Sequence, residues 1–256
     1  MARYIKFEQP LNEKVRIFLR LEFLFNLIEY YEKNMSEPDI REILNNLFHV
    51  TDLIGRTDIK GELIKELDRQ GSSLSGLQNK PGVDEARLTS VLEKITTCQE
   101  DLRSSQYQPG QVLRQDELLA AVKQRNTMPG GTCNFDLPSY HHWLHRSLEE
   151  HAAKLREWQS DLTVIKDSVY LALHLIRNRS KSTSETAENG FFQRTLEPST
   201  SCNMIRVLLP EKSPCYPEIS GGKHRFSVRF MEQPDTAQRP TQVNYNVAFE
   251  LHCCLL

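Results

Sequence analysis

Through the first two-thirds of the chain, apolar residues recur at steps of three and four residues, as they do in helices with one buried face. Proline, glycine and N-capping residues interrupt this pattern and mark helix ends. The pattern predicts seven helices, over about 11–31, 36–55, 58–71, 83–102, 116–126, 139–159 and 161–179. Helices of this kind, joined by short polar turns, predict a helical bundle.

The start of the second predicted helix is a specific signal. Ser36 is a preferred N-cap residue, and Pro38 falls in the first turn. Asp39 can return a hydrogen bond to the capping residue, which predicts a capping box.

Beyond residue 190 the period of the pattern changes from 3.6 to 2, which is typical of strands. Phe226, Val228 and Phe230 alternate with polar residues, and a second alternating run covers 243–251. A more uniformly apolar strand is predicted over 204–209, and 3–8 could add an edge strand from the N-terminus. Three or four strands make a thin sheet, whose apolar face must be covered by the bundle or by a second subunit.

Between these regions, 180–190 has no apolar periodicity and is rich in Ser, Thr and Glu, which indicates a linker. The predicted fold class is therefore α+β. An α-helical domain is expected over 9–180, a linker over 181–190, and a small, sandwich-like β domain over 191–256 that strand 3–8 could join.

The charge of the chain argues against some partners. Its 32 Lys and Arg residues nearly balance 34 Asp and Glu residues, and the balance holds on both sides of residue 180. Neither part is a basic module, so nucleic acid or an anionic membrane is not expected as the main partner. No apolar run reaches the ~18–20 residues of a membrane-spanning helix, and the N-terminus lacks a signal peptide's apolar stretch, so we expect a cytoplasmic protein.

The cysteines, at positions 98, 133, 202, 215, 253 and 254, show no CxxC pair and no zinc-finger spacing. The neighbours Cys253 and Cys254 cannot easily bridge each other without strain. We therefore expect free thiols in a reducing compartment.

No sequence motif identifies an enzyme. His141 and His145 have the i, i+4 spacing of a helical metal pair, but His142 stands where a zinc hydrolase has glutamate, and no third ligand is evident. The turn 129–132 (PGGT) lacks the GK[ST] of a phosphate-binding loop, and no GxSxG elbow is present. Polar-face histidines, at least one of which could pair with an acidic group, are the favoured interpretation, and no cofactor is expected.

A pair of arginines on the first helix is a candidate binding surface. Arg16 and Arg20 lie at i and i+4, facing away from the apolar seam. Two like charges so placed cost about 0.2–0.5 kcal/mol unless an anion neutralises them. The alternative is that Glu13 pairs with Arg16 while Arg20 stays solvated.

A second arginine pair lies on a predicted strand. Arg225 and Arg229 are four residues apart and so project from one face, next to Lys223 and His224. Exposed arginines on strands often serve only solubility. Two basic faces in a chain of nearly balanced charge nevertheless hint at an acidic or carboxylate-bearing partner.

Several blocks of the sequence resemble one family, the bacterial cell-division protein ZapD. They occur in one order along nearly the whole chain, and the likeness fades in 180–190 and in the last residues. The blocks are 7–16 (FEQPLNEKVR), 19–24 (LRLEFL), 63–70 (LIKELDRQ), 81–84 (PGVD), 128–131 (MPGG), 135–138 (FDLP), 143–145 (WLH), 216–221 (YPEISG) and 224–231 (HRFSVRFM).

The resemblance implies a helical domain plus a β domain, a symmetric homodimer and a non-enzymatic role. That role is to bind the C-terminal tail of the tubulin-like protein FtsZ and to bundle its filaments at the mid-cell division ring. The resemblance also implies which residues bind the tail: Arg20, Arg56, His141, Arg225 and Arg229. Arg114 is a weaker candidate, because this chain has Glu117 where the family pattern would allow a basic residue.

Two alternatives from other classes remain open. One is a metal-dependent enzyme that uses the His141/His145 pair, which stoichiometric bound metal would support. The other is a nucleic-acid-binding regulator that uses the helical region, which a steep fall of binding with salt would support.

Overall fold

The structure is a computed structural model that describes residues 3–78, 80–197, 202–222 and 224–255. The chain forms two compact units. The helical unit is Leu19–Ala172, and the sheet unit combines Met1–Phe18 with Leu173–Leu256. The boundaries between the units fall within α1 (Glu13–Tyr31) and α9 (Thr163–Asn178).

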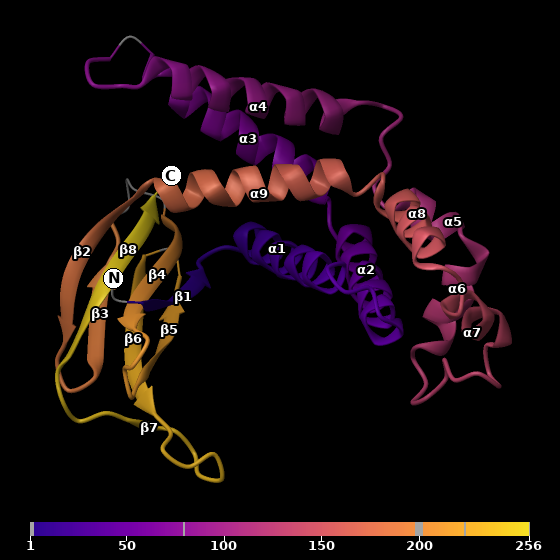
Figure 1. The fold of residues 1–256 in the computed structure, drawn as a ribbon. Helices are drawn as coiled ribbons and strands as arrows, with labels where there is room; N and C mark the ends of the chain where they lie inside the picture. Colours follow the sequence, from indigo (N-terminus) through magenta and orange to yellow (C-terminus); the bar gives the residue numbers. More distant parts are fainter. Residues whose placement is uncertain (1–2, 79, 198–201, 223, 256) are drawn as a thin grey trace. The chain divides into compact units, whose positions relative to one another are not determined.

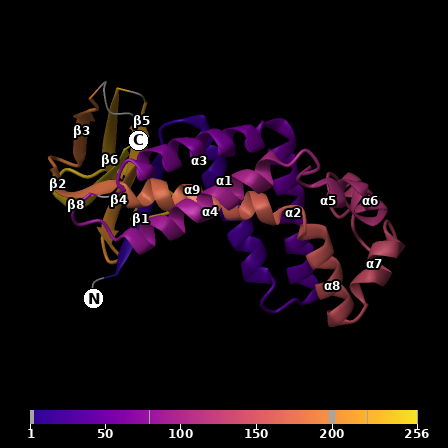
Figure 2. The same cartoon turned by 90° about the horizontal axis from the view of Figure 1, so that it is seen from above.

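The predicted helical bundle is confirmed. Besides most of α1 and the first part of α9, the helical unit contains α2 (Glu37–Arg56), α3 (Ile59–Ser75), α4 (Glu85–Arg103), α5 (Gln111–Gln115), α6 (Glu117–Arg125), α7 (Pro138–Leu144) and α8 (Leu148–Gln159). α3 and α4 lie side by side as a helical hairpin (Figures 1 and 2). Among the helices that the structure describes, none is both long enough and apolar enough to cross a membrane.

Capping side chains explain where several helices begin. At the start of α2 the Asp39 N–H donates to Ser36 Oγ at 3.4 Å, and the Ser36 N–H donates to the Asp39 carboxylate at 3.0 Å, which confirms the predicted capping box. Ser147 and Glu150 form a second capping box at the start of α8. Because this second box starts a new helix, the single helix predicted over 139–159 is wrong, and α7 and α8 take its place.

The sheet unit contains two antiparallel sheets (Figure 1). One has the strand order β1-β4-β8-β2; the other has the order β3-β6-β5, with β7 paired to β6. The strands are β1 (Tyr4–Pro10), β2 (Ser180–Ala187), β3 (Phe191–Thr195), β4 (Cys202–Pro210), β5 (Tyr216–Gly221), β6 (Arg225–Glu232), β7 (Thr241–Gln242) and β8 (Val247–Leu255). The predicted N-terminal edge strand is confirmed, because β1 pairs with β4 along its whole length.

The linker predicted over 181–190 is wrong for most of its length. Strand β2 occupies this segment and pairs with β8 from Ser180 opposite Cys254 to Ala187 opposite Val247. β2 lies at the edge of its sheet and buries only Ala187 fully among its described side chains. An edge strand held by backbone hydrogen bonds can stay polar, so it shows no apolar alternation in the sequence.

The predicted sandwich-like β domain is confirmed, whereas the expectation of one thin sheet with an apolar face that the bundle or a second subunit must cover is wrong. Val207 and Leu251 from one sheet share a core with Phe226 and Phe230 from the other. The rings of Phe230 and Phe249 lie 5.0 Å apart across this core. In the described strands each sheet therefore covers the apolar face of the other, as in a β-sandwich.

Candidate functional site

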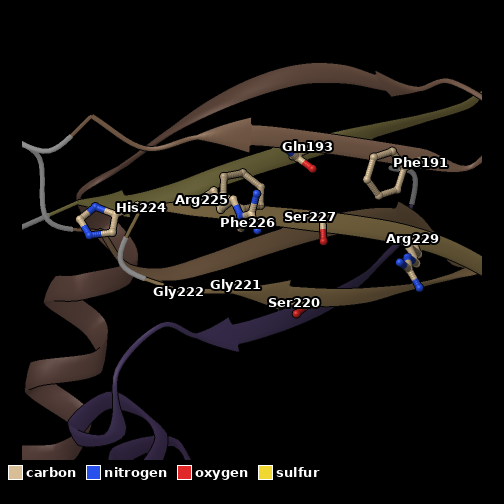
Figure 3. A pocket seen from close by; sticks show the side chains of 10 residues that line it. All are labelled: Phe191, Gln193, Ser220, Gly221, Gly222, His224, Arg225, Phe226, Ser227 and Arg229. Carbon is tan, nitrogen blue, oxygen red and sulfur yellow. The ribbon is translucent and has the colours of Figure 1, made fainter.

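The outer face of the sheet β3-β6-β5 has a hollow of about 500 Å³ that Arg225 and Arg229 help to line, which we call the sheet hollow (Figure 3). Phe226 and Phe230 of β6 are almost completely buried in the sandwich core. Because side chains alternate along a strand, Arg225, Ser227 and Arg229 project from the opposite, outer face. The predicted shared face of the two arginines follows from this alternation.

Strand pairing supplies the rest of the sheet hollow. Gln193 of β3 and Ser220 of β5 lie opposite Ser227 in the middle of the hollow. Phe191 of β3 lies opposite Arg229 at one end. The floor between the two arginines is therefore made of short or uncharged side chains, and Figure 3 shows these residues on three neighbouring strands.

The arginines of the sheet hollow are exposed and positively charged. Glu218 lies opposite Arg229 on β5, but within the described residues neither Arg225 nor Arg229 forms an ion pair. At ~3.3 Å per residue, their backbones are about 13 Å apart along β6. Lys223, predicted to lie beside them, is outside the described residues.

The helical unit has a hollow of about 480 Å³ between α1 and α2, which we call the helix hollow. It brings together the predicted residues Arg20 and Arg56. Its lining residues are Arg20, Phe23 and Leu24 from α1, and His49, Asp52, Leu53 and Arg56 from α2.

The helix hollow combines positive charge with an apolar side chain. Arg20 and Arg56 are exposed, and in the part of the chain that the structure describes they pair with no carboxylate. The one acid in the lining, Asp52, accepts a 2.6 Å hydrogen bond from Lys123 and is thereby neutralised. Phe23 is 62% exposed. This surface suits a peptide that offers a carboxylate next to an apolar side chain.

The other two predicted residues lie in separate hollows of the helical unit. Arg114 lines a hollow of about 400 Å³ with Phe48 and Lys123, and its guanidinium donates a 2.8 Å hydrogen bond to the Pro109 carbonyl. His141 lines a hollow of about 450 Å³ in which Phe135 is 79% exposed. The structure therefore does not bring Arg114 or His141 into the helix hollow.

The histidine pair considered for metal binding is close but incomplete. The ring centres of His141 and His145 are 4.5 Å apart, and His145 Nδ1 lies 2.9 Å from the His141 carbonyl oxygen. Among the described residues no group of three or more His, Cys, Asp or Glu side chains could hold a metal ion. Hydrogen bonding from Arg41, with smaller effects of His145 and His141, holds the pKa of Glu37 below its usual value.

Some lining residues were not predicted. In the helix hollow these are Phe23, three residues after Arg20, and His49, seven residues before Arg56. Residues at these spacings lie on one face of a helix, so the sequence could have indicated that both lie beside the arginines. Phe191 and Ser220 join the sheet hollow only through pairing with β6, which no local pattern specifies.

Comparison with known proteins shows the family. The family model ZapD, described as "Cell division protein", matches residues 19–229. The cell division protein ZapD of Methylococcus capsulatus is 38% identical over 256 residues, covering 100% of both chains. Cell division proteins ZapD of an Enterobacter species and of Chromobacterium violaceum are 35% and 36% identical, covering 99% and 98% of this chain and 100% and 99% of theirs. The resemblance found in the sequence is confirmed, and the chain belongs to the ZapD family of cell division proteins.

Proposed function

We propose that this protein is a non-enzymatic, cytoplasmic adaptor that binds the C-terminal tail of FtsZ and bundles FtsZ filaments at the mid-cell division ring. Its family gives it a role in cell division. One observation supports tail binding. Two open hollows contain arginines that, within the described residues, pair with no carboxylate. A guanidinium group can hold a carboxylate through two parallel hydrogen bonds, so these hollows suit an acidic, flexible segment.

In the sheet hollow the tail would lie extended across the uncharged floor, with its carboxylates on Arg225 and Arg229. In the helix hollow a carboxylate would bind Arg20 and Arg56, and an apolar side chain would pack on Phe23. Each exposed ion pair contributes only about 0.2–1 kcal/mol, so a single tail binds weakly and in a salt-sensitive way.

Bundling requires that one particle holds two filaments, and a homodimer provides two copies of each hollow. Many tails along a filament raise the effective concentration, so modest single-site affinity becomes firm attachment. Because the sandwich buries the inner faces of both sheets, the dimer surface lies elsewhere than on those faces.

The test is co-sedimentation with polymerised FtsZ that has or lacks its C-terminal tail. We expect the protein to pellet with the tailed polymer and to stay in the supernatant with the tailless one. Equal pelleting in both cases would refute the proposed mode of binding.

Charge reversal tests the two hollows separately. Arg225→Glu and Arg20→Glu should each reduce co-sedimentation several-fold. The matched controls are Arg239→Glu in the sheet unit and Arg87→Glu in the helical unit, because both residues are exposed and outside the hollows. If the reversed proteins and the controls bind equally, the hollows do not bind the tail.

The Arg114→Glu and His141→Ala variants, tested in the same way, decide whether the other two hollows take part.

Light scattering tests the homodimer. A protein that is strictly monomeric at micromolar concentration would contradict bundling by a dimer.

A further inference from the structure

Cys202 and Cys253 lie on the same face of the sheet β1-β4-β8-β2, although they are far apart in sequence. Cys253 of β8 is paired with Ile205 of β4, and both side chains face the sandwich core. Cys202 belongs to the same core. The two thiols interact, because each shifts the pKa of the other.

A bulge in β4 creates this arrangement. The register shifts between Cys202 and Met204. In a regular ladder Asn203 would lie opposite Leu255, but here Cys202 takes that position. Side chains alternate along a strand, so an unbulged β4 would direct the Cys202 side chain to the opposite face. The extra residue therefore places the Cys202 thiol on the face of Cys253.

A charged pair flanks the two thiols. Arg194 of β3 pairs with Glu185 of β2 at 2.6 Å, which ties an edge strand of one sheet to an edge strand of the other. The positive charge of Arg194 also acts on the Cys253 thiol. The interaction with Cys202 and the positive charge of Arg194 together lower the pKa of Cys253 to about 7, against the effect of burial. The same interaction between the two thiols, together with burial, raises the pKa of Cys202.

The two cysteines are therefore unequal. Cys253 is partly exposed, whereas Cys202 is only 8% exposed. A reactive cysteine is a thiolate that is accessible and stabilised by positive charge. Cys253 fits the attacking thiol, and Cys202 fits the thiol that resolves the product.

We propose that Cys202 and Cys253 are a peroxide-sensitive thiol pair that forms a reversible disulfide. The Cys253 thiolate attacks one oxygen of hydrogen peroxide; the S–O bond forms, the O–O bond breaks, and the released hydroxide takes a proton to become water. The Cys202 sulfur then attacks the Cys253 sulfenic acid and loses its proton; the S–S bond forms, the S–O bond breaks, and a second water leaves. Two thiols and one peroxide give one disulfide and two waters, and a small thiol reductant reverses the reaction by exchange.

The test uses the full chain, brief treatment with hydrogen peroxide, alkylation of the remaining thiols, and peptide mass spectrometry. We expect a disulfide between the Cys202 and Cys253 peptides, which dithiothreitol removes, while Cys98, Cys133 and Cys215 are alkylated. A disulfide that joins other cysteines, or oxidation of Cys253 that is no faster than that of Cys98 and Cys133, would overturn the proposal.

Substitutions separate the two roles. Cys202→Ser should leave a sulfenic acid on Cys253 that reacts with dimedone, whereas Cys253→Ser should leave Cys202 unlabelled. The control Cys215→Ser should still form the disulfide. Labelling of Cys202 in the absence of Cys253 would contradict the assigned order.

Arg194 is a positioning residue in this proposal. Arg194→Gln should slow alkylation of Cys253 several-fold at neutral pH but not in alkaline buffer, where the thiolate forms without help. Arg194→Lys should restore most of the neutral rate, because it keeps the positive charge. Equal slowing at both pH values would show that the substitution acts on packing and would refute the role of charge.

Discussion

Glu8 and Arg206 lie directly opposite each other on β1 and β4, and their side chains form an ion pair at 2.8 Å. Arg177, in the last turn of α9, approaches the same carboxylate at 2.8 Å. Burial raises the pKa of Glu8, but the hydrogen bonds and charges of Arg177 and Arg206 outweigh this effect and hold the pKa below the usual 4.5. The carboxylate thus joins the edge strand β1 to a central strand and to a helix end.

We expect Glu8→Gln to lower the free energy of unfolding by about 1–3 kcal/mol at neutral pH, because it removes the anion that the poorly solvated side chains of Arg177 and Arg206 share. A carboxyl group whose pKa is lower in the folded state stabilises the fold above its unfolded pKa. This stabilisation is lost as the pH falls through the folded pKa. Urea denaturation should therefore show a gap between wild type and variant at neutral pH that shrinks below about pH 4.5.

The matched control is Glu211→Gln, which breaks a 3.4 Å ion pair with Arg3 in which both side chains are well exposed. Such surface pairs contribute about 0–1 kcal/mol, so this variant should differ little from wild type. If Glu8→Gln and the control lose the same stability, or if the gap persists in acid, the buried carboxylate is not its source.

Elements with a strong local signal were predictable from the sequence. The capping box at Ser36 and the alternation of Phe226, Val228 and Phe230 specify α2 and β6 through neighbouring residues alone. The polar edge strand β2 has no such signal, because its backbone bonds to β8 stabilise it and its side chains are mostly exposed. The strand order of the two sheets has no local signal for the same reason, since β2 adds a strand to one sheet and leads into β3 of the other.

In the candidate site, too, some features follow from local sequence patterns and others depend on packing or strand pairing. Arg20 and Arg56 were predicted, but their meeting in one hollow depends on the packing of α1 against α2. Arg225 and Arg229 share a face because of strand alternation, which the sequence contains. Gln193 of β3 forms part of the floor between them, because it pairs with Ser227 more than thirty residues further along the chain. No local sequence pattern specifies which strands pair.

Asp116 links two helices, and its removal should be costly. One carboxylate oxygen accepts the Leu119 N–H at 3.0 Å as the N-cap of α6, and the other accepts the indole N–H of the fully buried Trp158 at 2.8 Å. Asp116→Ala removes the cap and leaves the indole N–H without this acceptor, so we expect a loss of about 2–3 kcal/mol. Asp116→Asn keeps one acceptor oxygen and should lose less. Thermal unfolding followed by tryptophan fluorescence measures both; equal losses would contradict the double role.

The capping box of α2 gives a smaller, local prediction. Ser36→Ala removes the side chain that accepts the Asp39 N–H, so stability should fall by about 1 kcal/mol. Ser104→Ala is the control, because Ser104 is exposed at the C-terminal end of α4 and its cap contacts are made by the backbone. Circular dichroism during heating compares the two. If the midpoint of thermal unfolding of Ser36→Ala equals that of the control, the capping box does not contribute to stability.

We expect the substitutions of the two arginines in the helix hollow to have coupled effects on the binding of an FtsZ tail peptide. If Arg20 and Arg56 hold the same carboxylate, Arg20→Glu alone should remove most of the binding energy of this hollow. Adding Arg56→Glu should then cost less than it does in the wild type, with a coupling energy of about 0.5–3 kcal/mol. Arg20→Glu combined with Arg87→Glu is the control, and its effects should add because Arg87 does not line the hollow. Titration calorimetry at constant ionic strength measures all variants. Additive effects of Arg20→Glu and Arg56→Glu would mean that the two guanidinium groups do not bind one group of the tail.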